Sequence, residues 1–355
     1  MTGTVAPFGY GGLSAQQRLS LSSLSKQHDS LQTQASTGVV SDSYAGLGAS
    51  RAQALALQPA ITQVSAWSSN ITTAQNRLTT TQTALDQIST IASDLNETLS
   101  TLTGSVSAST LGVASQQAKT ALTTLGSLLN TQQGDSYIFG GLQSSEAPVN
   151  GDPGSSNMAS SIANAVKELG TQGAAAVLSS TLDAAKDTSE NQPFSAALST
   201  DPTTASKQNL KIVTGKNETV SAGMVVTQGT SSSDASTGSP IRDLMRNLMV
   251  VASLGSADAG STDYTQLIQG LQTTNAKAVD GLADMSGSLG IQQNTLTSQS
   301  TMLEQMKSAL TTQLGTAKNA DLAQVSVQLN DTSNQLQASY SIIADMKGMT
   351  LASYL

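Results

Sequence analysis

Apolar residues recur along most of this chain at alternating intervals of three and four, which is the spacing of a coiled-coil seam. The longest run covers residues 57–102, and Thr81 is its only polar member. A compact globular domain rarely needs a helix of that length. We therefore expect a mainly α fold, a long coiled-coil helical bundle. The residues that we assign to the bundle core are Trp67, Ile71, Leu78, Leu85, Ile88, Leu95, Leu99 and Leu102.

Seams with the same spacing lie near both ends of the chain, at residues 21–35, 282–310 and 322–346. Residues 111–128 have the pattern of a return helix that closes a hairpin. Pro59 is expected in the first turn of the long helix, where its missing N–H costs nothing. The end seams must pair with each other or with other copies. We assign to an assembly interface Leu21, Leu24, Leu31, Leu322, Val325, Leu329, Leu336, Tyr340, Ile343, Met346, Leu351, Tyr354 and Leu355.

The centre of the chain, residues 146–239, breaks this pattern. Turn-forming residues bound it at 150–154 and 229–240. Between them lie two short helical patterns, at 162–169 and 177–185, and an alternating stretch at 210–227 that predicts a β-hairpin. Residues 241–252 follow Ser239-Pro240 and predict an amphipathic helix. The chain ends are thus helical, and the middle is a mixed α/β insert.

Composition excludes several classes of function. The net charge is −8 and the 16 Lys and Arg residues are scattered, whereas nucleic-acid binding requires a basic surface. No run of 18 apolar residues occurs, so we expect no membrane span. The first 12 residues lack the basic and apolar regions of a cleavable signal peptide. Only 3% of residues are aromatic, which suits closely packed helices better than a deep pocket.

The chemistry available to the chain is limited. It has no cysteine and only one histidine, His28, so thiolate chemistry and two-histidine metal sites are excluded. We expect no catalytic residues, no metal and no cofactor, and hence no enzyme. His28 lies on a seam, where it is either a packed neutral side chain or a pH-sensitive assembly switch. Asp94 and Glu97 share a helical face that we interpret as solvated and acidic.

Short motifs at both ends are similar to those of the flagellin superfamily. Near the N-terminus they are Leu31-Gln32-Thr33-Gln34-Ala35-Ser36-Thr37-Gly38, then Ser41-Asp42 and Ala45-Gly46-Leu47; near the C-terminus they are Leu336-Gln337-Ala338-Ser339-Tyr340-Ser341 and Leu351-Ala352-Ser353-Tyr354-Leu355. Within the superfamily, Tyr137-Ile138-Phe139-Gly140-Gly141 resembles the run that closes the first helical hairpin of hook-filament junction proteins. The resemblance covers about residues 10–145 and 240–355.

The resemblance implies three domains. Residues 1–40 and 320–355 would form a terminal coiled-coil assembly domain that is disordered in the monomer. Residues 41–145 and 240–319 would form a helical bundle, and residues 146–239 a variable, outward-facing middle domain. Because the resemblance stops at this middle domain, we expect assembly to tolerate its deletion.

The implied function is a structural subunit of the bacterial flagellum that joins hook to filament. Its partners would be copies of itself, other hook-associated protein and flagellin subunits, and an export chaperone in the cytoplasm, with no nucleic acid and no membrane. It would be extracellular and leave the cell by type III export without a cleaved signal peptide. The alternatives are a flagellin of the filament itself, or a secreted type III needle-tip or translocator-like protein. An enzymatic or sugar-binding insert is a third class, but no motif supports it.

Overall fold

The computed structural model describes residues 10–104, 106–189 and 192–348. Its contacts divide the chain into two compact units, Met1–Ser65 with Glu304–Leu355, and Ala66–Leu303. The first and last residues of the second unit lie within the long helices α2 (Arg51–Thr101) and α8 (Thr262–Lys318). The described chain is mainly helical, with helices at both ends and short strands only in its middle, which confirms the predicted fold class.

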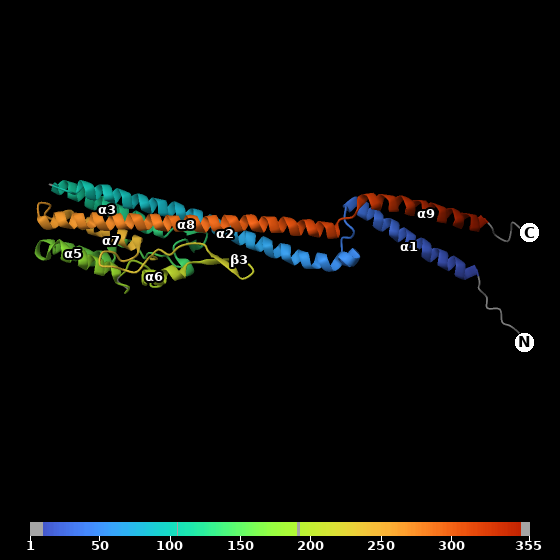
Figure 1. Cartoon of the computed structure of the whole chain (residues 1–355), viewed down its shortest axis with the longest axis horizontal. Coiled ribbons are helices and arrows are strands. Elements are labelled where there is room, and N and C mark those ends of the chain that lie inside the picture. The colour runs from blue at the N-terminus through green and yellow to red at the C-terminus, as the bar shows by residue number, and fades with distance from the viewer. Residues whose placement is uncertain (1–9, 105, 190–191, 349–355) are drawn as a thin grey trace, which may run out of the picture. The chain divides into compact units, whose positions relative to one another are not determined.

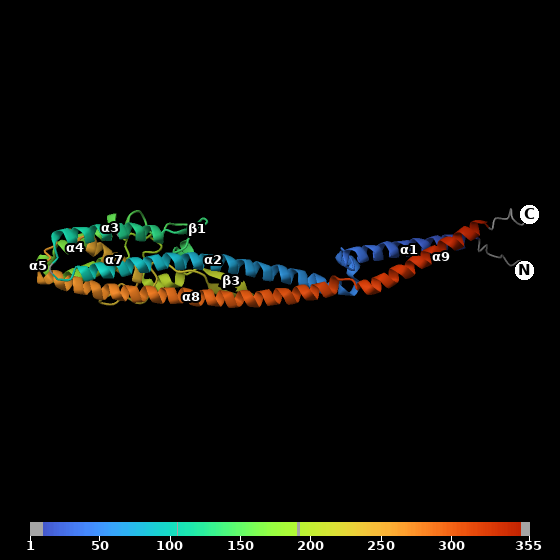
Figure 2. The ribbon, with the colours of Figure 1, turned by 90° about the horizontal axis from the view of Figure 1, so that it is seen from above.

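The bundle of the second unit forms where α8 lies along α2, with α3 (Ala108–Leu129) beside them (Figures 1 and 2). From Ile71 to Leu102 the predicted seam is buried, whereas Trp67 is only half-buried. Thr81 is buried in this seam, and its hydroxyl donates to the Arg77 carbonyl at 2.8 Å. A helical Thr can satisfy its hydroxyl in this way, so the polar position fits the core.

Pro59 lies inside α2 rather than in its first turn, so the predicted start of this helix was wrong. A proline inside a helix removes one backbone hydrogen bond and costs about 3 kcal/mol. The helix nevertheless extends back to Arg51, because Ala54 and Leu57 are buried on the same face. Burial of these side chains offsets part of the proline's cost.

The insert begins after α3. The chain makes the strands β1 (Gln132–Gln133) and β2 (Ser136–Tyr137), then the single turns η2 (Gly141–Gln143) and η3 (Pro153–Ser155). The two predicted short helices are α4 (Asn157–Lys167) and α5 (Leu169–Lys186). The short turns α6 (Pro202–Ala205) and η4 (Ser206–Gln208) lead into the hairpin.

The hairpin consists of β3 (Lys211–Gly215) and β4 (Glu218–Ser221), which pair antiparallel. The sequence predicted a longer hairpin, extending through Val226. The strand ends earlier because the following residues bond elsewhere: Val225 bridges Gly140, and the Val226 N–H donates to the Phe139 carbonyl at 3.1 Å. These bonds fasten the end of the hairpin to the segment that follows α3.

Helix α7 (Pro240–Ala252) is followed by the turn η5 (Leu254–Ser256). The sequence predicted an amphipathic helix here, and the helix has separate apolar and polar faces, but neither face is in solvent. Every residue from Ile241 to Val251 is buried, because α3 packs on one side and α4 and α5 pack on the other. Its polar side chains are therefore inside the protein: Arg242, Asp243, Arg246 and Asn247.

The buried cations of α7 bond to the backbone of the insert. Arg242 donates to the carbonyls of Leu198 and Thr200, at 3.2 and 2.8 Å. Arg246 donates to the Leu178 carbonyl at 2.9 Å and to the Thr181 hydroxyl. Burial lowers the pKa of Arg242 to about 10, and nearby Asp201 and Asp243 partly oppose this shift. The insert thus supplies the polar partners of a helix that the bundle covers.

The other unit contains α1 (Tyr10–Thr37), the turn η1 (Tyr44–Ser50) and α9 (Leu322–Gly348). Gly38 ends α1 with a φ of +73°, a conformation that favours glycine. Leu47 of η1 is buried, as are Ala54 and Val64 of α2 and Ala317 of α8. The core of this unit is small compared with that of the bundle.

Candidate assembly interface

Helices α1 and α9 pack against each other in opposite directions (Figures 1 and 2). The seam predicted near the N-terminus therefore faces the seam predicted near the C-terminus. Leu31 and Val325 are buried in this contact, and so is Thr332. The half-buried seam residues are Leu21, Leu24, Leu329, Leu336 and Ile343. The structure thus brings most of the described interface residues to one helix pair.

A short clip joins the two helices where they meet the rest of their unit. The Val40 N–H donates to the Lys318 carbonyl at 2.8 Å, and the Ala320 N–H donates to the Gly38 carbonyl at 2.9 Å. Val39 and Asn319 form an antiparallel bridge between these bonds. The clip fixes the register in which α1 and α9 pair.

A cation contact reinforces the clip. The Lys318 ammonium lies 4.9 Å from the centre of the Tyr44 ring, within the range of a cation–π interaction. Tyr44 belongs to η1, and Lys318 is the last residue of α8. The contact therefore connects the segment that follows α1 to the segment that precedes α9.

The pair leaves a groove of about 340 Å³ between α1 and α9. Leu21 and Leu24 line one side of it, and Ile342 and Ile343 line the other, among Gln and Ser side chains. Side chains of two helices that pack tightly would leave no such volume, since protein interiors are close-packed. Two helices alone therefore do not bury this apolar surface.

Two predicted interface residues point away from the pair. Leu322 is 51% exposed and Tyr340 is 56% exposed. The seam assignment also missed Leu19, Val327 and Ile342, which are exposed apolar residues of α1 and α9. They do not continue the three-and-four spacing of the seam. Only the presence of a large apolar side chain on an otherwise polar helix face could have identified them. An exposed apolar surface of this kind is an association site.

The remaining predicted interface residues lie outside what the structure describes. These are the side chain of Met346 and the residues Leu351, Tyr354 and Leu355. Their place in the interface stays a prediction.

His28 is half-buried in α1, and its Nδ1 lies 3.8 Å from the Asp29 carboxylate. This separation is the outer limit of an ion pair, and the Asp29 side chain is largely solvated. The geometry suits a partly packed histidine at the edge of the seam.

The described residues contain no group of three or more His, Asp or Glu side chains that could hold a metal ion. Within the same residues, no helix is long and apolar enough to cross a lipid bilayer.

The run Tyr137-Ile138-Phe139-Gly140-Gly141 forms a buried joint between α3 and the insert. Ile138 and Phe139 are fully buried. Arg77 of α2 donates to the carbonyls of Tyr137 and Ile138, at 2.6 and 3.2 Å. Burial lowers the pKa of Arg77. Sequence reasoning did not identify Arg77, because a single polar residue beside a seam reads as solvent-exposed.

Gly141 is required at this joint by both backbone and space. Its φ is +56°, and a Cβ atom would lie 2.5 Å from the Gln208 carbonyl oxygen and from Val225. A side chain there would push these two residues of the insert away from residue 141. The second glycine of the run therefore allows the insert to close on the bundle.

Paired terminal helices, an apolar surface left open between them and a long helical bundle together define a structural coiled-coil subunit. Comparison with known families agrees with this class. Residues 11–144 match the bacterial flagellin N-terminal helical region, and residues 273–355 match the bacterial flagellin C-terminal helical region. Together these regions cover more than half of the chain, which belongs to the flagellin superfamily. No curated protein matches the chain.

Membership in this family makes the chain a structural subunit of the bacterial flagellum. Flagellin-family subunits associate with one another into the extracellular flagellar polymer. The two matched regions contain α3, α9 and all but the first residue of α1, and neither covers residues 145–272.

Proposed function

We propose that the chain is the subunit that joins the flagellar hook to the filament. The observation that carries this proposal is the joint at residues 137–141, which resembles the corresponding run of hook-filament junction proteins. In this chain the run has a structural role, because Arg77 holds its carbonyls and Gly141 admits the insert. Gly141, which allows the insert to pack closely at this point, is one of the residues that carry the resemblance.

Assembly would take place through α1 and α9. Leu21, Leu24 and Ile343 line an open groove in one copy, and equivalent side chains of neighbouring copies would fill it. Burying apolar area contributes roughly 25 cal/mol per Å², so many small contacts repeated along a polymer give a stable joint. The proposed partners are copies of the chain, other hook-associated subunits and flagellin, with an export chaperone before secretion.

The abundance of the protein in sheared flagella tests this proposal. A junction subunit occupies only a short zone, so it should be a trace component beside the filament flagellin. The measurement is quantitative mass spectrometry of sheared flagella from the native cells. If the chain is the dominant component, it is a filament flagellin and the junction proposal is wrong.

A strain that lacks the protein gives a second readout. Cells without a junction subunit should complete their hooks and release unpolymerised flagellin into the medium. A single substitution, Gly141→Val, should reproduce part of this defect, whereas Gly112→Val should not, because nothing lies within 4 Å of a Cβ at Gly112. Normal filaments in the deletion strain would contradict the proposal.

A further inference from the structure

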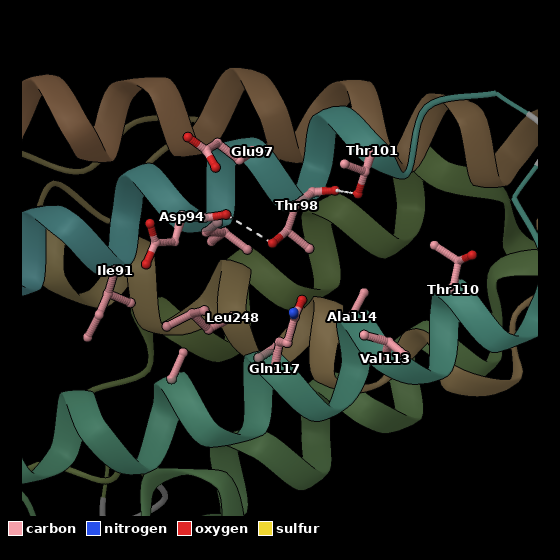
Figure 3. A pocket seen from close by; sticks show the side chains of 13 residues that line it. Ile91, Asp94, Glu97, Thr98, Thr101, Thr110, Val113, Ala114, Gln117 and Leu248 are labelled. Atoms are coloured by element: carbon pink, nitrogen blue, oxygen red, sulfur yellow. Dashed lines mark hydrogen bonds between the residues drawn. The ribbon is translucent and has the colours of Figure 1, made fainter.

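A groove of about 630 Å³ lies in the second unit between α2 and α3 (Figure 3). Ile91 of α2 and Val113 of α3 line it, and Leu248 of α7 lies at its base. Val113 is 58% exposed although it is apolar. The α3 side contributes several alanines, whose small side chains leave the space open. The result is a concave, largely apolar surface that the described chain does not fill.

The rim of this groove is acidic. Asp94 and Glu97 lie one turn apart on α2, and both are exposed (Figure 3). Neither forms an ion pair with any described residue. The sequence from Leu78 to Ala118 contains three acidic residues and no Lys or Arg. An occupant with both apolar and positively charged side chains would therefore complement the groove.

The hairpin segment of the same chain has this chemistry. Lys207, Lys211 and Lys216 are exposed, and none has an ion pair among the described residues. No acidic residue occurs between Pro202 and Asn217. On the same segment Val213 is apolar and 49% exposed. We define residues 207–216, which include β3, as the basic hairpin. Glu218, the first residue of β4, lies just beyond it, and its carboxylate accepts a hydrogen bond from Gln299 at 3.0 Å.

The basic hairpin cannot enter the groove of its own chain. The Asn70 side chain donates to the Val213 carbonyl at 3.2 Å, which holds the hairpin beside residue 70 of α2. The groove begins at Ile91 on the same helix. At ~1.5 Å per residue, the separation from Asn70 to Ile91 is about 30 Å. Only another copy can therefore bring a basic hairpin to the groove.

We propose that the basic hairpin of one copy docks in the α2–α3 groove of the next. The inference rests on the proposed assembly function and adds a second contact to the α1–α9 interface. Val213 would face Val113 and Ile91, and the lysines would face Asp94 and Glu97. Because the two surfaces differ, the contact is head-to-tail, and such contacts generate rings or open helical chains of subunits rather than two-fold symmetric dimers.

Thiol crosslinking tests the contact directly, since the chain has no cysteine of its own. The experiment mixes full-length Lys216→Cys and Glu97→Cys variants with a short thiol-reactive crosslinker. We expect a covalent dimer that contains one copy of each variant. As a matched control, Lys216→Cys is mixed with Asp183→Cys, an exposed carboxylate away from the groove. A dimer in the control at equal yield would overturn the assignment.

Charge reversal gives an independent readout. Asp94→Lys with Glu97→Lys, or Lys211→Glu with Lys216→Glu, should each slow polymer elongation about tenfold at low salt, because opposed charges steer association. The combined variant should recover to within about threefold of the original rate. Lys119→Glu with Lys167→Glu is the control, since Lys119 of α3 and Lys167 of α4 do not line the groove. Equal slowing by the control pair would show that the effect does not come from the groove and would contradict the proposed contact.

The outcomes separate this inference from the proposed function. If unmodified chains polymerise but no mixed dimer forms, the hairpin contact is wrong and the assembly function stands. If a mixed dimer forms in chains that never polymerise, the contact is correct and the assembly function fails. If neither occurs, the hairpin contact and the proposed assembly through α1 and α9 are both wrong.

Discussion

Leu85 and Asp94 lie on the same helix and differ in environment. Leu85 is fully buried in the α2 seam, whereas Asp94 is exposed. Leu85→Ala should lower the free energy of unfolding by about 2–5 kcal/mol, through lost burial and the cavity left behind. Asp94→Ala should change it by less than about 0.5 kcal/mol. Urea unfolding of the purified monomers measures both, and equal losses would contradict the assigned seam.

Tyr264 gives the bundle a pH dependence at high pH. Its buried hydroxyl donates to the Leu102 carbonyl at 3.2 Å, and burial raises the pKa of this tyrosine. In the unfolded chain tyrosine titrates near ~10, so above that pH the unfolded state loses a proton that the folded state retains. The contribution of Tyr264 to stability is therefore complete below that pH and is lost as pH rises through the folded pKa.

Tyr264→Phe tests this sign. The variant should lose roughly 1 kcal/mol at neutral pH, from the missing hydrogen bond. Its stability should then fall less steeply than that of the original chain as pH rises above the ordinary tyrosine pKa. Urea unfolding at a series of pH values measures the two slopes. Parallel slopes would show that Tyr264 titrates alike in both states.

At the scale of helices and strands, spacing identified each long helix from one apolar face but not always where it begins. Helix α2 begins at Arg51, before Pro59, and α8 begins at Thr262, well before the predicted seam at 282–310. The amphipathic pattern predicted helix α7 but not the burial of its polar face. The partners of its arginines are backbone carbonyls of Leu178, Leu198 and Thr200, which no sequence pattern encodes. The groove between α2 and α3 was also invisible in the sequence. It exists because small alanines of α3 face α2, and alanine also fits a close-packed seam.

The contacts of α7 change what we expect from deletion of the insert. Removing residues 150–235 would take away α4 and α5, which cover one side of α7, together with the carbonyls that Arg242 and Arg246 bond. Buried apolar side chains of α7 would then be exposed to solvent. Exposing apolar side chains that were buried costs roughly 25 cal/mol per Å² of apolar area. We now expect the deletion to destabilise the bundle, contrary to the expectation from sequence that assembly would tolerate it. Thermal unfolding of the deletion variant measures this.

A substitution at Arg246 separates lost charge partners from lost packing. In the intact chain, Arg246→Met should destabilise the protein, because it leaves the Leu178 carbonyl without its donor. In the deletion variant, the same substitution should change stability by less than about 0.5 kcal/mol, because α5 no longer covers the arginine and solvent replaces its lost partners. An equal loss in both backgrounds would show that the contacts of Arg246 with the insert do not explain its effect.

The terminal helices are predicted to fold fully only on assembly. Residues 1–40 and 320–355 contain the α1–α9 pair, whose groove and exposed side chains lack a partner in one chain. In the free monomer, amides of 15–37 and 322–345 should exchange hydrogen rapidly, and those of 71–99 slowly. Hydrogen exchange followed by mass spectrometry measures this difference. Slow exchange throughout α9 in a proven monomer would contradict the prediction.

At the scale of the whole molecule, the surfaces proposed to carry function are contacts that one chain leaves unfinished. The α1–α9 groove lacks an occupant, and the α2–α3 groove and the basic hairpin are complementary but cannot meet within one copy. Such a chain functions by binding its neighbours in a polymer, so its function depends on where in the flagellum it is assembled. Family membership shows that the chain is a flagellar subunit, and the run at residues 137–141 supports its proposed location at the hook-filament junction.

Immunogold electron microscopy of intact flagella tests that placement most directly. Antibodies raised against a peptide of the insert that contains the exposed residues 230–234 would label the protein where it is assembled. If the chain is the junction subunit, gold particles should be confined to one zone between the hook and the filament of each flagellum. Label distributed along the whole filament would contradict this placement and identify the chain as a filament subunit.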